Sequence, residues 1–167
     1  MPVYMGSQRI RELYVGGQRV KSAHMWNGTA WQRVHIMPVL TPSRVVKSGN
    51  QVVQQGNQPT GWVLSGGYQG SATTNGLLVV GAGTVNITAQ ARFAASGLNR
   101  TMKITRNGSQ IGSGSASGSS NLVSASASSV TVGDGDVISF THTVSATGDA
   151  WLTVVGGADT YIQITAA

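Results

Sequence analysis

Apolar and polar residues alternate over much of the chain after residue 60, and this period of two predicts β-strands. The longest alternating run is 84–93. Its apolar side chains would all lie on one face: Val85, Ile87, Ala89, Ala91 and Phe93. Because successive side chains of a strand point to opposite faces, we expect this face to be buried.

Shorter runs of the same kind predict further strands at 62–65, 77–80, 102–105, 110–111, 122–132, 137–144, 150–155 and 160–165. The apolar phase slips between Ala127 and Val130, which predicts a β-bulge. Residues 112–121 consist only of Gly, Ser, Ala and Asn, and we expect a mobile loop there. Eight or nine short strands at this spacing predict an all-β chain with almost no helix, folded as an antiparallel jelly-roll β-sandwich.

The first 37 residues predict a smaller β-structure, two hairpins in series. Strands are expected at 10–15, 18–26 and 29–36, with tight turns at Gly16–Gly17 and Asn27–Gly28. A three-stranded meander of this size buries too little apolar surface to be stable alone. Its aromatic residues would be half exposed, so we expect it to pack on another copy or another protein.

Residues 38–61 are polar and rich in Gly, Gln and Pro, and they are predicted to be a linker with one short edge strand, at 44–46 or at 52–53. The sequence therefore predicts three parts: a hairpin anchor at 1–37, a linker at 38–61 and a jelly roll at 62–167.

Charge separates the two ends of the chain. Residues 1–47 contain seven Arg and Lys and one Glu, a net charge of +6, whereas residues 48–167 contain four basic and four acidic residues. Arginines interleaved with aromatics fit nucleic-acid binding or protein docking. We favour protein docking, because the segment contains no nucleic-acid-binding motif. The residues expected to dock are Tyr14, Arg19, Trp26, Trp31 and Arg33.

Composition limits the remaining chemistry. The chain has no cysteine, which excludes a disulfide framework and thiolate metal sites. No apolar run approaches the roughly 20 residues of a membrane span. The N-terminus has no basic segment followed by an apolar one, so we expect no secretory signal and synthesis and folding in a cytoplasm.

Candidate chemical groups are few. His24 and His35 have no acidic or cysteine companion for a metal, and His142 falls on the apolar phase of its strand, as an interior histidine would. Asp134 and Asp136 fit either a calcium site or a turn, and we favour the turn. No nucleophile elbow occurs and Glu12 is the only glutamate, so we expect neither an enzyme nor a cofactor.

The body resembles the jelly roll of the complement-globular-head and tumour-necrosis-factor-like proteins. The resemblance rests on four blocks, 85–93, 102–111, 130–138 and 160–165. The segments YVGGQRVK at 14–21 and WNGTAWQRV at 26–34 are similar to small minor tail proteins of actinobacterial phages. The resemblance implies a homotrimeric virion component that its N-terminal segment attaches to other tail proteins.

Two alternatives stay open. The protein would equally fit a decoration or head fibre on the capsid. The body could also bind a host cell-wall glycan, with aromatic residues near loops stacking on sugar rings. The candidate contacts are Trp62, Tyr68, Trp151 and Tyr161, whose other interpretation is packing inside the core or an interface.

Overall fold

A computed structural model describes residues 4–5, 8–9, 14–15, 18–19, 22–36 and 40–167. Before residue 22, and at 33–36, it describes the backbone only. The chain divides into two compact units, Met1–Val39 and Leu40–Ala167.

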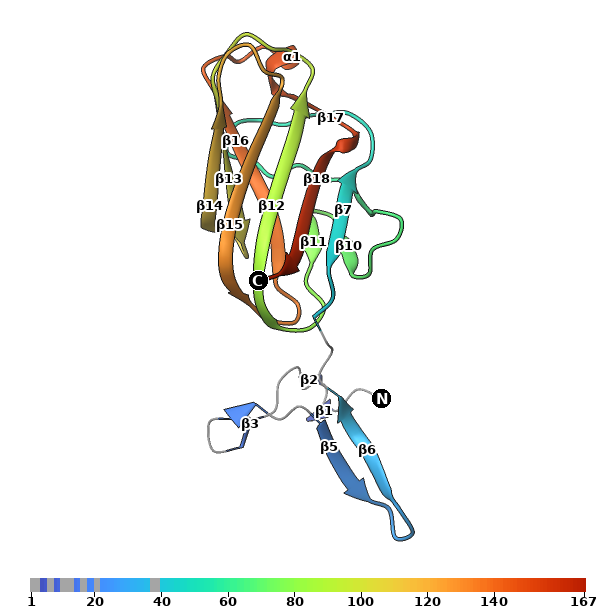
Figure 1. The fold of residues 1–167 in the computed structure, drawn as a ribbon. Helices are drawn as coiled ribbons and strands as arrows, with labels where there is room; N and C mark the ends of the chain where they lie inside the picture. Colours follow the sequence, from blue (N-terminus) through green and yellow to red (C-terminus); the bar gives the residue numbers. More distant parts are fainter. Residues whose placement is uncertain (1–3, 6–7, 10–13, 16–17, 20–21, 37–39) are drawn as a thin grey trace. The chain divides into compact units, whose positions relative to one another are not determined.

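The body, Leu40–Ala167, is built almost entirely of antiparallel strands (Figure 1). They are β7 (Ser43–Lys47), β8 (Gln51–Val52), β9 (Trp62–Leu64), β10 (Ser71–Thr73), β11 (Gly76–Leu78), β12 (Gly83–Phe93), β13 (Arg100–Arg106), β14 (Ser109–Ala116), β15 (Leu122–Val132), β16 (Val137–Val144), β17 (Thr153–Val155) and β18 (Gly157–Ala166). In the described residues the only helix is α1 (Asp149–Leu152), a single turn. No helix of the described chain has the length and apolar character that crossing a membrane requires.

The strands follow one path, β10-β11-β16-β13-β14-β15-β12-β18-β7-β9. The path folds over where β14 meets β15 through a single paired position, Ser113 with Ser126. It thus forms two layers, with β15, β12, β18 and β7 in one and β11, β16 and β13 in the other (Figure 1). The body is an antiparallel jelly-roll β-sandwich, as the alternating pattern predicts.

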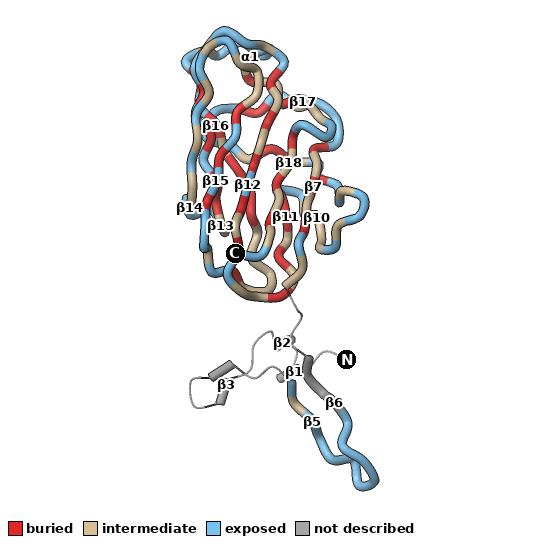
Figure 2. The backbone as a smooth tube through the Cα atoms, in the orientation of Figure 1, coloured by how far each residue is buried: buried red, intermediate tan, exposed pale blue. Residues whose placement is uncertain are grey.

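The predicted buried face of the longest strand is confirmed. All five apolar side chains of β12 are at most 1% exposed, and they pack in the core between the layers (Figure 2). The predicted bulge is also confirmed, because the pairing of β12 with β15 shifts register between Val85 and Ile87. The extra residue lies in β15, where Ser129 has a φ of 52°.

The loop predicted at 112–121 is wrong for its first half, because β14 continues to Ala116. Two glycines explain this. A Cβ at Gly112 would lie 2.4 Å from the Ser126 carbonyl oxygen, and one at Gly114 would lie 1.9 Å from that of Ser124. The low-complexity composition therefore allows β15 to approach closely, and it does not indicate mobility in this half.

Residues 38–61, predicted as a linker, contain two strands of the body. Strand β7 pairs with β18 on one side and β9 on the other, with Ser43, Val45 and Lys47 facing inward. The Lys47 ammonium donates hydrogen bonds to the carbonyls of Ser48 and Gly49, so its polar end is satisfied inside the fold. The short strand expected at 44–46 or 52–53 is thus present at both places, but β7 is paired on both sides and is not an edge strand.

Residues 150–155, predicted as one strand, are divided between helix α1 and strand β17. The Thr153 hydroxyl donates a hydrogen bond of 2.7 Å to the Asp149 carbonyl, one turn earlier. Leu152 is 1% exposed and anchors the turn to the core. The strand begins only after this anchor, where β17 pairs with β8 and β12.

The described residues of the N-terminal unit form three separate two-stranded sheets, not one meander. They pair β1 (Tyr4–Met5) with β2 (Gln8–Arg9), β3 (Tyr14–Val15) with β4 (Gln18–Arg19), and β5 (Ser22–Trp26) with β6 (Trp31–Ile36). The strand predicted over 18–26 is divided between β4 and β5, and the first hairpin was not predicted. The expected Gly16–Gly17 turn lies outside the described residues.

The variant Gly114→Ala tests the close approach of β14 and β15. We expect it to lower the free energy of unfolding by about 1–3 kcal/mol, because the added methyl group must displace the β15 backbone. Urea unfolding would measure the change, with Ser115→Ala, an exposed position of the same strand, as the control. Equal stability of Gly114→Ala and the wild type would contradict the described strand.

Candidate functional site

The hairpin β5–β6 presents two tryptophans across from each other. Trp26 ends β5 and pairs with Trp31 at the start of β6, and their ring centroids lie 5.7 Å apart with planes inclined by 58°. The loop between them has four residues instead of the predicted two. The Asn27 side-chain oxygen accepts hydrogen bonds from the backbone N–H groups of Thr29 and Ala30, which stabilises the wider loop.

These side chains are exposed. Met25 is 57% exposed, Trp26 51% and Trp31 69%. Contact with a partner would remove on the order of 200 Å² of apolar indole surface from water, stabilising a complex by about 5 kcal/mol before the loss of entropy is subtracted. Exposed apolar clusters of this kind mark interaction sites, so the hairpin tip is the candidate docking site.

The other predicted docking residues are placed by their backbone alone. Tyr14 pairs with Arg19 in the hairpin β3–β4, and Arg33 pairs with His24 in the hairpin β5–β6. The backbone therefore pairs Tyr14 with Arg19 and Trp26 with Trp31, in two separate sheets. The side chains of Tyr14, Arg19 and Arg33 lie outside the described residues.

The predicted ligand-binding aromatics do not form one surface. Trp62 is 6% exposed and packs edge-on against Phe140, while its indole N–H donates a hydrogen bond to the Pro59 carbonyl. Its assignment as a surface contact is therefore wrong, because the indole is buried in the core and its N–H group already has a hydrogen-bond partner.

The remaining three aromatics are half-buried and lie on different elements. Tyr68 lies in the loop between β9 and β10, Trp151 in α1 and Tyr161 in β18. Tyr161 is covered by a cation, since the Arg44 guanidinium carbon lies 3.9 Å from its ring centroid. Whether any of them contacts a ligand stays a prediction.

The turn interpretation of the two aspartates agrees with their hydrogen bonds. The Asp136 carboxylate accepts hydrogen bonds from the Gly133 N–H and from the Asn107 side chain, and the Asp134 carboxylate accepts one from the Gly81 N–H. Among the described residues, no three acidic, histidine or cysteine side chains cluster as metal ligands.

His24 and His35 are not brought together as a pair. His24 pairs with Arg33 and His35 pairs with Ala23, with a bulge between these two positions. The side chain of His35 lies outside the described residues.

His142 is the interior histidine that its strand phase predicts. It is 1% exposed, and its ring lies edge-on to Phe93 with 4.8 Å between centroids. Burial, and then the nearby positive charge of Arg100, lower the pKa of His142 to about 4. The imidazole is therefore neutral at pH 7.

Arg100 was missed as a candidate in the sequence. It is 1% exposed and lies with Met102 and Ile104 on the buried face of β13. The sequence offered one signal of its burial: Arg100 lies two and four residues before Met102 and Ile104, on the same face of the strand. Burial lowers the pKa of Arg100, since the interior disfavours its charge.

The buried His142 makes the stability of the body pH-dependent. Its folded-state pKa lies below its unfolded value of 6.5, so the stabilisation is complete above pH 6.5 and is lost as the pH falls toward 4. We expect the free energy of unfolding to fall by about 2 kcal/mol between pH 7 and pH 5 from this residue. Chemical denaturation at both pH values would show a smaller fall in His142→Gln than in the wild type; an equal fall in both proteins contradicts the assignment.

Comparisons with known proteins find similarity in fold only. No protein-family model matches the sequence, and no curated protein is significantly similar to it. Among solved structures, the chain is similar to the Eiger TNF of S. frugiperda, with a TM-score of 0.60 and 14% sequence identity over 78% of this chain and 95% of that one. At this identity the likeness supports the jelly-roll fold alone.

Proposed function

We propose that the protein is a structural component of a bacteriophage virion, a small minor tail protein or tail-associated spike. Its N-terminal hairpins attach it to other tail proteins, and its jelly roll projects from them. The observation that carries this proposal is the separation of properties along the chain. Seven of the eleven basic residues, only one acidic residue and the most exposed aromatic side chains of the described chain, Trp26 and Trp31, lie within the first 47 residues. Residues 48–167 carry four basic and four acidic residues and are neutral.

The hairpin tip is suited to protein docking. Tryptophan and arginine are the residues that contribute most to protein–protein interfaces, because they bury a large area and also form hydrogen bonds. The five basic residues and single Glu of Met1–Val39 complement an acidic surface on the neighbouring protein. A nucleic-acid partner has less support, since no known nucleic-acid-binding fold or motif accompanies the charge.

The proposal of attachment to the tail rests on the resemblance of the segments 14–21 and 26–34 to minor tail proteins, and the tumour-necrosis-factor-like jelly roll supports assembly as a homotrimer. In this proposal the protein is assembled in the host cytoplasm and carries no catalytic activity. Attachment to the capsid as a decoration or head fibre is the second candidate, and it shares every feature above except the identity of the neighbour. Labelling particles with an antibody against the body distinguishes them, because the label would lie on the tail or on the head.

Replacing both tryptophans tests the docking site. We expect Trp26→Ala with Trp31→Ala to reduce the copies of the protein in purified particles at least tenfold, since the apolar area that a partner would cover is lost. Quantitative immunoblotting of particles would measure this. Size-exclusion chromatography of the free variant would confirm that the body keeps its fold and oligomeric state.

A matched control is available on the body. Val63 and Leu64 in β9 are 46% and 43% exposed, so their double alanine variant also removes exposed apolar surface. We expect it to incorporate at the wild-type level. Normal incorporation of the tryptophan variant, or equal losses in both variants, would overturn the assignment of the hairpin as the anchor.

A further inference from the structure

Arg100 lies inside the sandwich with its charge uncompensated. Its guanidinium carbon is 4.4 Å from the centroid of Phe93 and 5.8 Å from that of Trp151. Its Nη2 donates one hydrogen bond of 3.2 Å to the Trp151 carbonyl. Nε and Nη1 are buried, and no group in the described part of the chain accepts a hydrogen bond from them. No carboxylate there pairs with Arg100.

A second unsatisfied group lies on the neighbouring strand. Strands β13 and β16 pair with Met102 opposite His142, so Arg100 and His142 are diagonal neighbours on the same buried face. Both ring nitrogens of His142 are buried and lack a hydrogen-bond partner among the described residues. Arg100 and His142 together therefore present N–H donors, with positive charge and no acceptor, at one end of the core.

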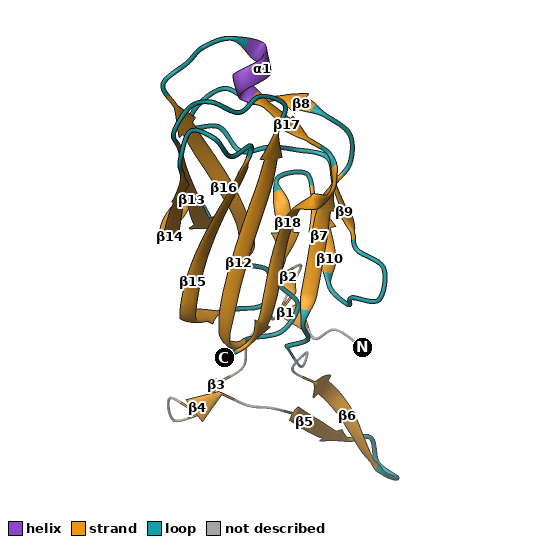
Figure 3. Cartoon of the chain, turned by 45° about the horizontal axis from the view of Figure 1, so that its top comes forward, coloured by secondary structure: helices purple, strands orange, loops and turns teal. Residues whose placement is uncertain are grey.

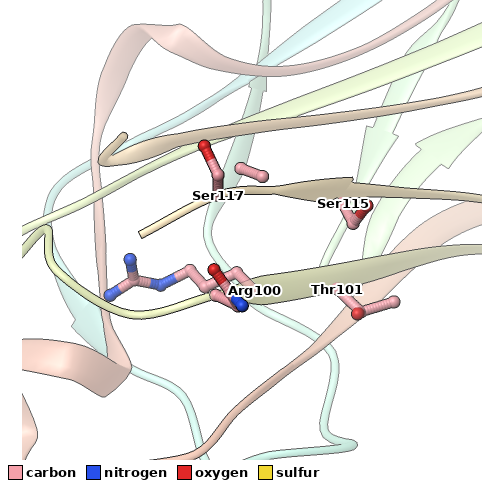
Figure 4. A pocket seen from close by; sticks show the side chains of 6 residues that line it. Arg100, Thr101, Ser115 and Ser117 are labelled. Carbon is pink, nitrogen blue, oxygen red and sulfur yellow. The ribbon is translucent and has the colours of Figure 1, made fainter. Parts of the chain in front are cut away.

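A hollow of about 400 Å³ opens at the end of β13 and β14 beside this pair. Its lining contains no acidic residue and exposes polar and apolar surface in nearly equal amounts: Asn99, Arg100, Thr101, Ser115, Ala116 and Ser117. The Arg100 side chain extends from β13 away from Thr101 and Ser115, toward the end of the strands where Ser117 lies (Figure 4). The hollow is as large as small-ligand sites in other proteins, and its wall supplies hydroxyl and amide groups.

Buried charges in proteins are paired with an opposite charge, because desolvating a lone ion is unfavourable. We propose that this end of the jelly roll binds a small oxyanion, a carboxylate or a phosphate group, which pairs with Arg100. The hydroxyl and amide groups of the hollow would contact the rest of the ligand. A free phosphate ion and the carboxylate of an acidic sugar both have this chemistry.

Trp151 lies next to the proposed site. Its ring packs on Gly97, where a Cβ would lie 3.2 Å from Cη2, and it lies beside the Arg100 guanidinium. The turn that carries it, α1, begins at Gly148 without a side-chain cap and lies at one end of the sandwich (Figure 3).

Thermal unfolding of the full chain tests the site. The probes are sodium phosphate, sodium glucuronate and glucose, each compared with sodium chloride at matched ionic strength. We expect phosphate, glucuronate or both to raise Tm by about 5 °C or more at saturation, and glucose to have no effect. The compound that raises Tm shows whether the site prefers a phosphate or the carboxylate of an acidic sugar. Absence of any rise beyond that in chloride would overturn the proposal.

Two variants assign the effect to the buried cation. Arg100→Met should abolish the rise in Tm, and Lys103→Met, which removes an exposed charge from the same strand, should keep it. A rise that persists in Arg100→Met overturns the proposal. If Arg100→Met does not fold, NMR of the wild type decides: saturable shifts of the Arg100 Nε–H and His142 ring signals support the site, and unchanged signals refute it. These measurements use no particles, so their outcome is independent of the proposed attachment.

Discussion

Strand β12 is the element on which the body depends. It pairs with β15 along one edge and with β18 along the other, and all its apolar side chains are buried between the two layers. The bulge at Ser129 and the glycines of β14 let the neighbouring strands curve and close around it. The apolar face of β12 is therefore buried within the body itself.

The N-terminal unit is built on the opposite principle. Its described sheets have two strands each, and the hairpin β5–β6 exposes both of its tryptophans. An isolated two-stranded hairpin is marginally stable in water. A contact that covers Trp26 and Trp31 would therefore bind the partner and stabilise the hairpin at the same time. The proposed attachment therefore depends on the same exposed apolar surface that leaves the hairpin marginally stable by itself.

The features that could be predicted from the sequence are those that depend on strict alternation of apolar and polar residues. The strands with a continuous apolar face, the bulge in β15 and the interior position of His142 all follow from a period of two. Three features broke this pattern. In strand β7 the polar side chains of Ser43 and Lys47 point inward. Strand β14 consists largely of Gly and Ser, and helix α1 interrupts a run of apolar residues. In each case tertiary contacts, and not local preference, determine the structure.

The same distinction applies to the candidate sites. The exposure of Trp26 and Trp31 could be predicted, because a small hairpin has no interior. The burial of Trp62 and the isolation of Arg100 could not, since both depend on which strands pack across the sandwich. The most direct test of the account compares hydrogen exchange at residues 22–36 in the free protein and in the assembled particle. The account predicts rapid exchange when free and strong protection in the particle, with the body unchanged; equal exchange in both states would contradict it.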